Sequence, residues 1–99
     1  MGWRVLGRNV RTAGGEIDLV AMDGDAVVLV EVKAKRAGGA ALSDRVDHAK
    51  RRRLLAAWSF IARGRGFVGR PWRFDVVEVD GTTSPPTVVL RRGAFRSRR

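Results

Sequence analysis

The sequence predicts an α/β fold in which a mixed β-sheet carries one crossover helix. Short segments rich in apolar and branched residues, separated by glycine-containing breaks, fill the first third of the chain. A segment with apolar residues at helical spacing follows, and two further apolar segments come after it. The predicted order is therefore β-β-β-α-β-β.

The first three strands are expected to form an antiparallel meander. Glycines at Gly14 and Gly15 separate the first strand from the second, and Gly24 marks a tight turn between the second and the third. Residues 27–30 are apolar without interruption, which is typical of a strand buried on both faces. The three strands are expected at residues 2–10, 16–22 and 26–33.

A helix is expected next, with Ser43 or Asp44 as its N-cap and Gly64 as its end. Two strands follow, at residues 72–79 and 87–90. Because a helix connects the third strand to the fourth, these two strands are expected to lie parallel, with the helix on one face of the sheet.

Length and composition set the overall frame. The 99 residues suffice for one domain, expected at residues 1–92 and followed by a basic tail at 93–99. A hydrophobic content of 44% argues against disorder, and the absence of cysteine excludes disulfides and thiol chemistry. No segment is long and apolar enough to span a bilayer, and the start does not resemble a signal peptide. A cytoplasmic location, with no membrane association, is the default expectation.

The net charge of +10 favours a polyanionic partner. Nucleic acid is the commonest such partner, and an anionic membrane surface is an alternative. A role in assembling a ribonucleoprotein would suit the same charge.

The hairpin at Gly24 predicts a cluster of charged residues. If residues 24 and 25 form its loop, Asp18 lies opposite Glu31 and Glu16 lies opposite Lys33. Because strand side chains alternate between faces, these four share one face. A loop of three residues would separate Asp18 from Glu31. The other face is expected to carry Ile17, Leu19, Val30 and Val32.

Directly opposed carboxylates destabilise a sheet by roughly 0.2–1 kcal/mol. Mg²⁺ or Mn²⁺ would offset this repulsion, because both prefer carboxylate oxygens. Lys33 could then stabilise charge on a scissile phosphate or help to deprotonate a metal-bound water. The alternative is a solvated strand face with a Glu16–Lys33 ion pair. Acidic residues are uncommon in strands, which favours the functional interpretation.

Several linked motifs resemble the YraN-like family of small bacterial proteins of unknown function. They are GWRVL (residues 2–6), RNVR (8–11), GEIDLVA (15–21) and VEVK (30–33). The resemblance extends over residues 2–61, with Val46, Lys50 and Leu54 continuing it.

That family is similar to the PD-(D/E)XK nucleases, which include restriction endonucleases and Holliday junction resolvases. The resemblance implies a restriction-endonuclease-like fold acting on branched or structured DNA. Asp18 and Glu31 would be metal ligands, Lys33 the catalytic lysine, and Glu16 a supporting ligand. The family's N-terminal helix, which carries a further glutamate, is expected to be absent, because Met1 directly precedes Gly2. A homodimer could then cover exposed sheet surface.

Basic residues around the cluster are the candidate nucleic-acid contacts, namely Lys35, Arg36, Lys50, Arg51 and Arg53. His48 is expected at the surface, and Asp75 and Glu78 at strand edges or ends. Three functions stay open: a metal-dependent endonuclease, a non-catalytic nucleic-acid-binding module on the same fold, and a small basic assembly protein.

Overall fold

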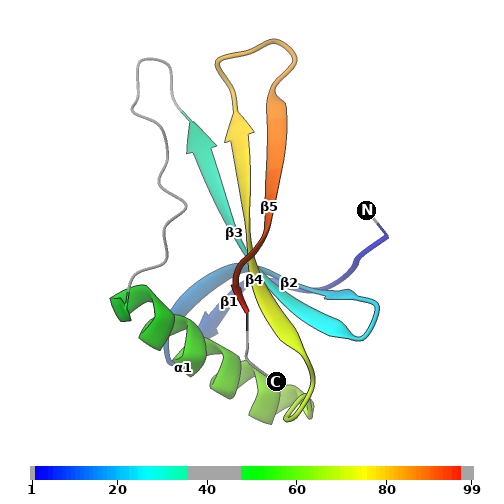
Figure 1. Cartoon of the computed structure of the whole chain (residues 1–99), viewed down its shortest axis with the longest axis vertical. Helices are drawn as coiled ribbons and strands as arrows, with labels where there is room; N and C mark the ends of the chain where they lie inside the picture. The colour runs from blue at the N-terminus through cyan, green and yellow to red at the C-terminus, as the bar shows by residue number, and fades with distance from the viewer. Residues whose placement is uncertain (1, 36–47, 97–99) are drawn as a thin grey trace.

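The computed structural model describes residues 2–35 and 48–96 and contains one sheet and one helix (Figure 1). The five strands lie in sequence order across the sheet, and β3 and β4 are parallel while the other neighbours are antiparallel. The predicted α/β order is therefore confirmed. The elements are β1 (Arg4–Thr12), β2 (Gly15–Asp23), β3 (Ala26–Lys35), α1 (His48–Arg65), β4 (Trp72–Asp80) and β5 (Thr87–Arg96).

The predicted register of the β2–β3 hairpin is also correct. Asp23 pairs with Ala26 and Leu19 pairs with Val30, so residues 24 and 25 form the loop. Gly24 has a positive φ of 61°, which a residue with a side chain rarely adopts. This turn determines which side chains of β2 and β3 lie on each face of the sheet.

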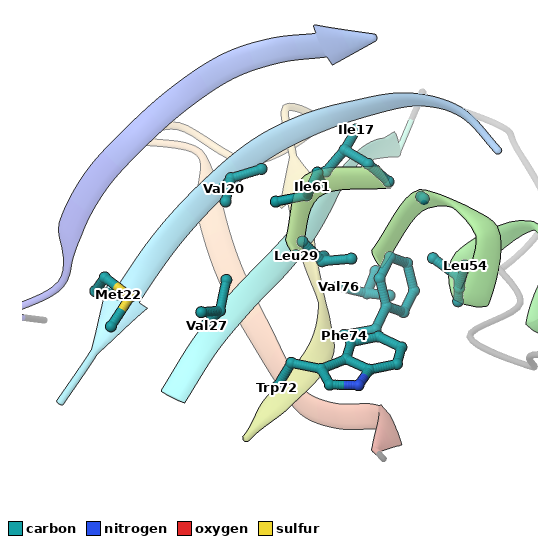
Figure 2. Close-up of a cluster of buried hydrophobic side chains, with 11 residues drawn as sticks. Ile17, Val20, Met22, Val27, Leu29, Leu54, Ile61, Trp72, Phe74 and Val76 are labelled. Atoms are coloured by element: carbon teal, nitrogen blue, oxygen red, sulfur yellow. The ribbon is translucent and has the colours of Figure 1, made fainter. Parts of the chain in front are cut away.

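The main core lies between α1 and one face of the sheet (Figure 2). Leu54 and Ile61 of the helix belong to one buried cluster with Phe74 and Trp72 of β4. Trp72 also stacks on Trp58, with ring centroids 5.2 Å apart. Burying such side chains is worth roughly 1.5–3 kcal/mol each. Ile17 joins this cluster, so the prediction that it lies on the face opposite to Glu31 was wrong. Because β2 curves over the helix in Figure 2, strict alternation does not hold at its start.

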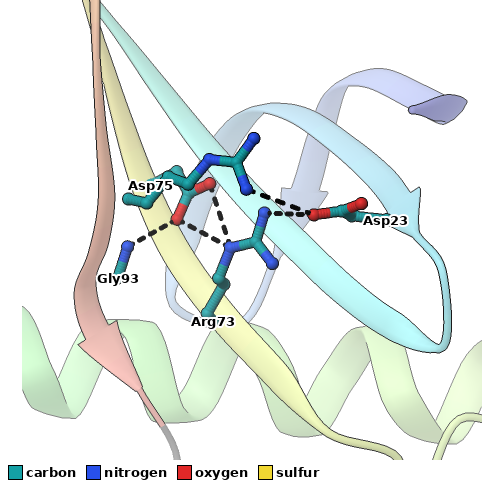
Figure 3. Close-up of polar contacts among 5 residues, drawn as sticks. Asp23, Arg73, Asp75 and Gly93 are labelled. Carbon is teal, nitrogen blue, oxygen red and sulfur yellow. Dashed lines mark hydrogen bonds and ion pairs between the residues drawn. The ribbon is translucent and has the colours of Figure 1, made fainter. Parts of the chain in front are cut away.

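Residues 27–30 are buried on both faces, as predicted. Val28 and Val30 belong to a second layer on the face away from α1, and fully buried Asp75 lies on the same face (Figure 3). α1 covers only one end of the sheet, and the far ends of β3, β4 and β5 extend beyond it in Figure 1.

Two boundaries differ from the predictions. The helix continues past Gly64, and the chain leaves it at Gly66, whose positive φ of 71° suits a helix end. β5 reaches Arg96, so residues 93–96 belong to the sheet rather than to a tail. The expected N-caps Ser43 and Asp44 lie outside the described residues.

The turn between β1 and β2 packs directly against the helix at Gly14. A Cβ added to Gly14 would lie 2.0 Å from the carbonyl oxygen of Arg53 and 2.8 Å from the amide nitrogen of Ala57. We expect Gly14→Ala to lower the free energy of unfolding by about 1–3 kcal/mol, because the helix must move away from β2. Urea denaturation measures this loss.

Gly64→Ala is the matched control for that experiment. Gly64 is helical, has no neighbour within 4 Å of an added Cβ, and should gain about 0.5–1 kcal/mol on replacement by alanine. Equal effects of the two substitutions would contradict the close packing at Gly14.

Candidate functional site

The candidate site begins where β2 separates from β3. The pairing between these strands ends at Leu19 and Val30, one residue before Asp18. The Oδ2 atom of Asp18 instead accepts a hydrogen bond of 2.8 Å from the backbone N–H of Val32. The prediction that Asp18 and Glu31 lie directly opposite one another, as a ladder pair, was therefore wrong. The strands diverge, and the carboxylate of Asp18 takes the place of a backbone acceptor.

Glu31 is the centre of the charged contacts in this region. Its Oε2 atom lies 2.7 Å from Nζ of Lys50 and 3.4 Å from Nζ of Lys33. Burial opposes the charge on Glu31, but the hydrogen bond and charge of Lys50, together with Lys33, outweigh it and hold the pKa of this carboxyl below its usual range. Glu31 is therefore an ionised acceptor at neutral pH.

Lys50 has a more central place than its sequence position suggested. It lies in the first turn of α1, and its Nζ lies 5.5 Å from the centroid of the Phe74 ring while it contacts Glu31. The helix and β3 are thus joined by an ion pair next to the core. Because this contact joins residues 19 apart, spacing along one strand could not predict it.

These side chains surround a pocket of about 150 Å³. Liquid water occupies roughly 30 Å³ per molecule, so the pocket has room for several waters or a hydrated ion. Its walls include Glu16, Asp18, Glu31, Lys50, Arg53 and Phe74. The structure therefore places Asp18, Glu31 and Glu16 around one cavity, with Lys33 beside Glu31.

The pocket offers oxygen ligands but no closed metal site. Within residues 2–35 and 48–96, no three histidine, cysteine or acidic side chains are grouped closely enough to hold an ion by themselves. Mg²⁺ often uses one or two carboxylates and fills its other positions with water and phosphate oxygens. Asp18 and Glu31 fit that open arrangement, and Glu16 is an exposed carboxylate on the pocket wall.

The other predicted nucleic-acid contacts that the structure describes lie on α1 and at the end of β3. Arg53 is exposed at the pocket wall, and Arg51 is exposed on the same helix. Lys35 is the last residue of β3, and Arg36 lies outside the described residues. His48 is exposed, as predicted.

A second charged network lies on the face away from the helix (Figure 3). Nε of Arg73 lies 3.1 Å from both carboxylate oxygens of Asp75, and Nη2 lies 2.9 Å from Oδ2 of Asp23. Asp75 also accepts a 2.7 Å hydrogen bond from the backbone N–H of Gly93, which ties β5 to β4. The prediction that Asp75 lies at an edge or end was wrong. The sequence did contain a signal for this burial, because Asp75 lies within a strand whose residues are apolar on both faces.

In this second network, Arg73 and Asp23 each stabilise the charged form of the other. Burial disfavours the guanidinium of Arg73, but its hydrogen bonds to Asp23 and Asp75 outweigh that effect and raise its pKa. The hydrogen bond from Arg73 lowers the pKa of the Asp23 carboxyl. The network is internally paired, so it serves the structure of the sheet rather than the pocket.

Comparison with known proteins identifies relatives along almost the whole chain. The model of the uncharacterised protein family UPF0102 matches residues 1–79. A UPF0102 protein of Xanthomonas campestris pv. campestris (strain B100) is 46% identical over 99 residues, covering 96% of this chain and 78% of that protein. One from Pseudomonas aeruginosa (strain UCBPP-PA14) is 44% identical, with 95% and 78% coverage.

The names of these relatives state no activity. α1 contains 18 residues, yet no helix in the described residues has the length and apolar character needed to cross a bilayer. The residues matched by the family model include Asp18, Glu31 and Lys33. The chain belongs to the uncharacterised protein family UPF0102.

Proposed function

We propose that this protein is a metal-dependent endonuclease that acts on branched or structured DNA. One observation carries the proposal: Asp18 and Glu31 line a single pocket where β2 and β3 diverge, and two lysines contact Glu31. Paired carboxylates can bind a divalent cation, and neighbouring ammonium groups can stabilise negative charge on a phosphate. Both properties suit phosphodiester hydrolysis, because negative charge on the phosphate must be stabilised during bond cleavage. The resemblance of the motifs around Asp18 and Glu31 to those of PD-(D/E)XK nucleases supports the same chemistry.

Each residue of the pocket has a distinct role in this proposal. Asp18 and Glu31 would hold Mg²⁺ or Mn²⁺, with Glu16 as a supporting ligand, and the bound ion would activate water and stabilise the leaving oxygen. Lys33 would stabilise charge that develops on the scissile phosphate. Lys50 would keep Glu31 ionised and positioned, since its Nζ lies closer to that carboxylate than the Nζ of Lys33 does.

The basic residues near the pocket would bind the DNA backbone. Arg51 and Arg53 are exposed on α1, and Arg53 lies at the pocket wall. Contacts with phosphates position a nucleic acid without reading its sequence. We therefore expect preference for the shape of a junction rather than for a base sequence.

A cleavage assay tests the proposal. The protein is incubated with duplex, single-stranded and four-way-junction DNA, in Mg²⁺, Mn²⁺ or EDTA, beside Asp18→Asn and Asp18→Ala. We expect cleavage that requires the metal and is lost in both variants, with the junction cut fastest. If none of the three substrates is cleaved in a metal-dependent way, the proposal of an enzymatic function is wrong.

A non-catalytic nucleic-acid-binding module is the second candidate, favoured because no three metal-binding side chains are grouped together within the described residues. It predicts binding that survives Asp18→Ala and does not depend on metal. A role in ribonucleoprotein assembly predicts tighter binding to structured RNA than to DNA. Steep loss of affinity with added salt is expected for all three, because phosphate contacts release counterions.

A further inference from the structure

The two edges of the sheet differ in how well they resist pairing with another strand. β1 carries a register irregularity between Val5 and Gly7 and a residue, Asn9, with a positive φ of 50°. It also carries three arginines, at Arg4, Arg8 and Arg11. Irregular backbone and charged side chains of this kind protect an edge strand from unwanted association.

β5, at the other edge, lacks these protections over residues 87–90. Its pairing with β4 is continuous from Thr87 to Arg91, and none of these residues has a positive φ. Val88 is 64% exposed and Val89 is 47% exposed, although β-branched apolar residues are typical of paired strands. No other described strand pairs with the outer edge of β5.

Alternate backbone N–H and C=O groups of residues 87–90 point away from β4, toward the outer edge of the sheet. The N–H of Thr87 donates to Oγ1 of Thr83 inside the β4–β5 hairpin at 3.1 Å. Because successive peptide groups of a strand point to opposite sides, the N–H and C=O groups of Val88 and Leu90 point to the open edge.

Apolar side chains also form rows that end at this edge. On the face away from α1, the strand registers align Val32 with Val77 and Leu90 in one row. The next row contains Ala34, Val79 and Val88. Val32 and Val88 are exposed, so in the part of the chain that the structure describes these rows form an apolar surface strip that stops at β5.

We propose that a second copy of this chain pairs antiparallel with β5, with Val89 on the two-fold axis. Val88 of each copy then lies opposite Leu90 of the other, and their outward backbone groups exchange hydrogen bonds. The rows of valine and leucine continue across the interface, so that a ten-stranded sheet forms with one apolar strip. A second copy fits because this segment is complementary to itself.

The neighbouring residues select this register. Sliding the second copy in one direction places Pro86, which has no N–H, opposite Leu90. Sliding it in the other direction places the charged Arg92 opposite Val88 in the apolar row. In the proposed register Arg91 faces Thr87, so no like charges are directly opposed.

The charges of the chain determine how the dimer should respond to salt. Near this edge Arg91 is neutralised by Glu78, 2.7 Å away, while the whole chain carries +10. Added salt screens the repulsion between the two copies and should strengthen the dimer. The opposite response is expected for nucleic-acid binding. The dimer and the proposed function can therefore fail independently.

Cross-linking tests the position of the interface. The chain has no cysteine, so Val89→Cys introduces a single thiol. Residues facing each other across an axis of this kind have Cα atoms about 4.5 Å apart, within the range of about 4.4–6.8 Å for a disulfide. We expect rapid oxidation to a covalent dimer. Val68→Cys, at a loop position that is 74% exposed, is the control and should cross-link only slowly.

Sedimentation measurements test the association itself. An edge pairing buries less surface than a standard stable interface, so we expect reversible dimers across a micromolar to millimolar series. Val88→Lys should weaken association more than tenfold, while Val5→Lys on the other edge should not change it. A monomer throughout the series, or equal cross-linking of the two cysteine variants, would overturn the proposal.

Discussion

Lys33→Ala is expected to lower metal-dependent cleavage of junction DNA by about a hundredfold to a thousandfold, the usual effect of removing one group that stabilises charge in the transition state. Nζ of Lys33 lies 3.4 Å from Glu31, on the β-strand that also supplies this carboxylate. The side chain does not form part of the core, so the variant should fold normally. Rates under single-turnover conditions, together with binding measured in EDTA, separate lost chemistry from lost affinity.

Lys50→Ala is the matched comparison for Lys33→Ala, because both lysines contact Glu31. Lys50 also contacts Glu31, at 2.7 Å, but it comes from α1 and packs over Phe74. If Lys33 is the residue that acts on the phosphate, Lys50→Ala should retain more activity, and its loss should be partly recovered with higher metal concentration. A smaller loss for Lys33→Ala than for Lys50→Ala would assign the catalytic role to the helix instead.

Asp75→Ala is expected to destabilise the fold by about 3 kcal/mol, since removing one partner of a buried ion pair leaves the other charge uncompensated. Arg73 is only 14% exposed and would keep Asp23 as its remaining partner. The substitution also removes the acceptor of the Gly93 N–H and so weakens the attachment of β5. Urea denaturation monitored by tryptophan fluorescence measures the change.

Two variants show whether burial is the cause. Asp75→Asn keeps an oxygen for Gly93 and should lose less stability than Asp75→Ala. Glu78→Ala removes a carboxylate from the same strand whose partner, Arg91, is exposed, and exposed pairs contribute only about 0.2–1 kcal/mol. If Asp75→Ala costs no more than Glu78→Ala, the network in Figure 3 has little structural role.

Local patterns in the sequence determined most of the fold. The glycine-centred turn at Gly24, the apolar residues 27–30 and the helical spacing after residue 48 were sufficient to predict the element order. They also predicted the β2–β3 register and the parallel pairing of β3 with β4. These features depend on neighbouring residues, turn geometry and the alternation of strand side chains, all of which can be read along the chain.

Tertiary structure alone decided the details of the site and of the second network. The contacts of Lys50 with Glu31 and of Arg73 with Asp23 join residues that are distant in sequence. The divergence of β2 from β3 at Asp18 depends on the curvature of the sheet. Residue types and spacing cannot predict such contacts, because the direction of a side chain is set by how whole elements pack. The sequence therefore identified Asp18, Glu31 and Lys33 as a group, and the packing of α1 on the curved sheet added Lys50 and shaped the pocket.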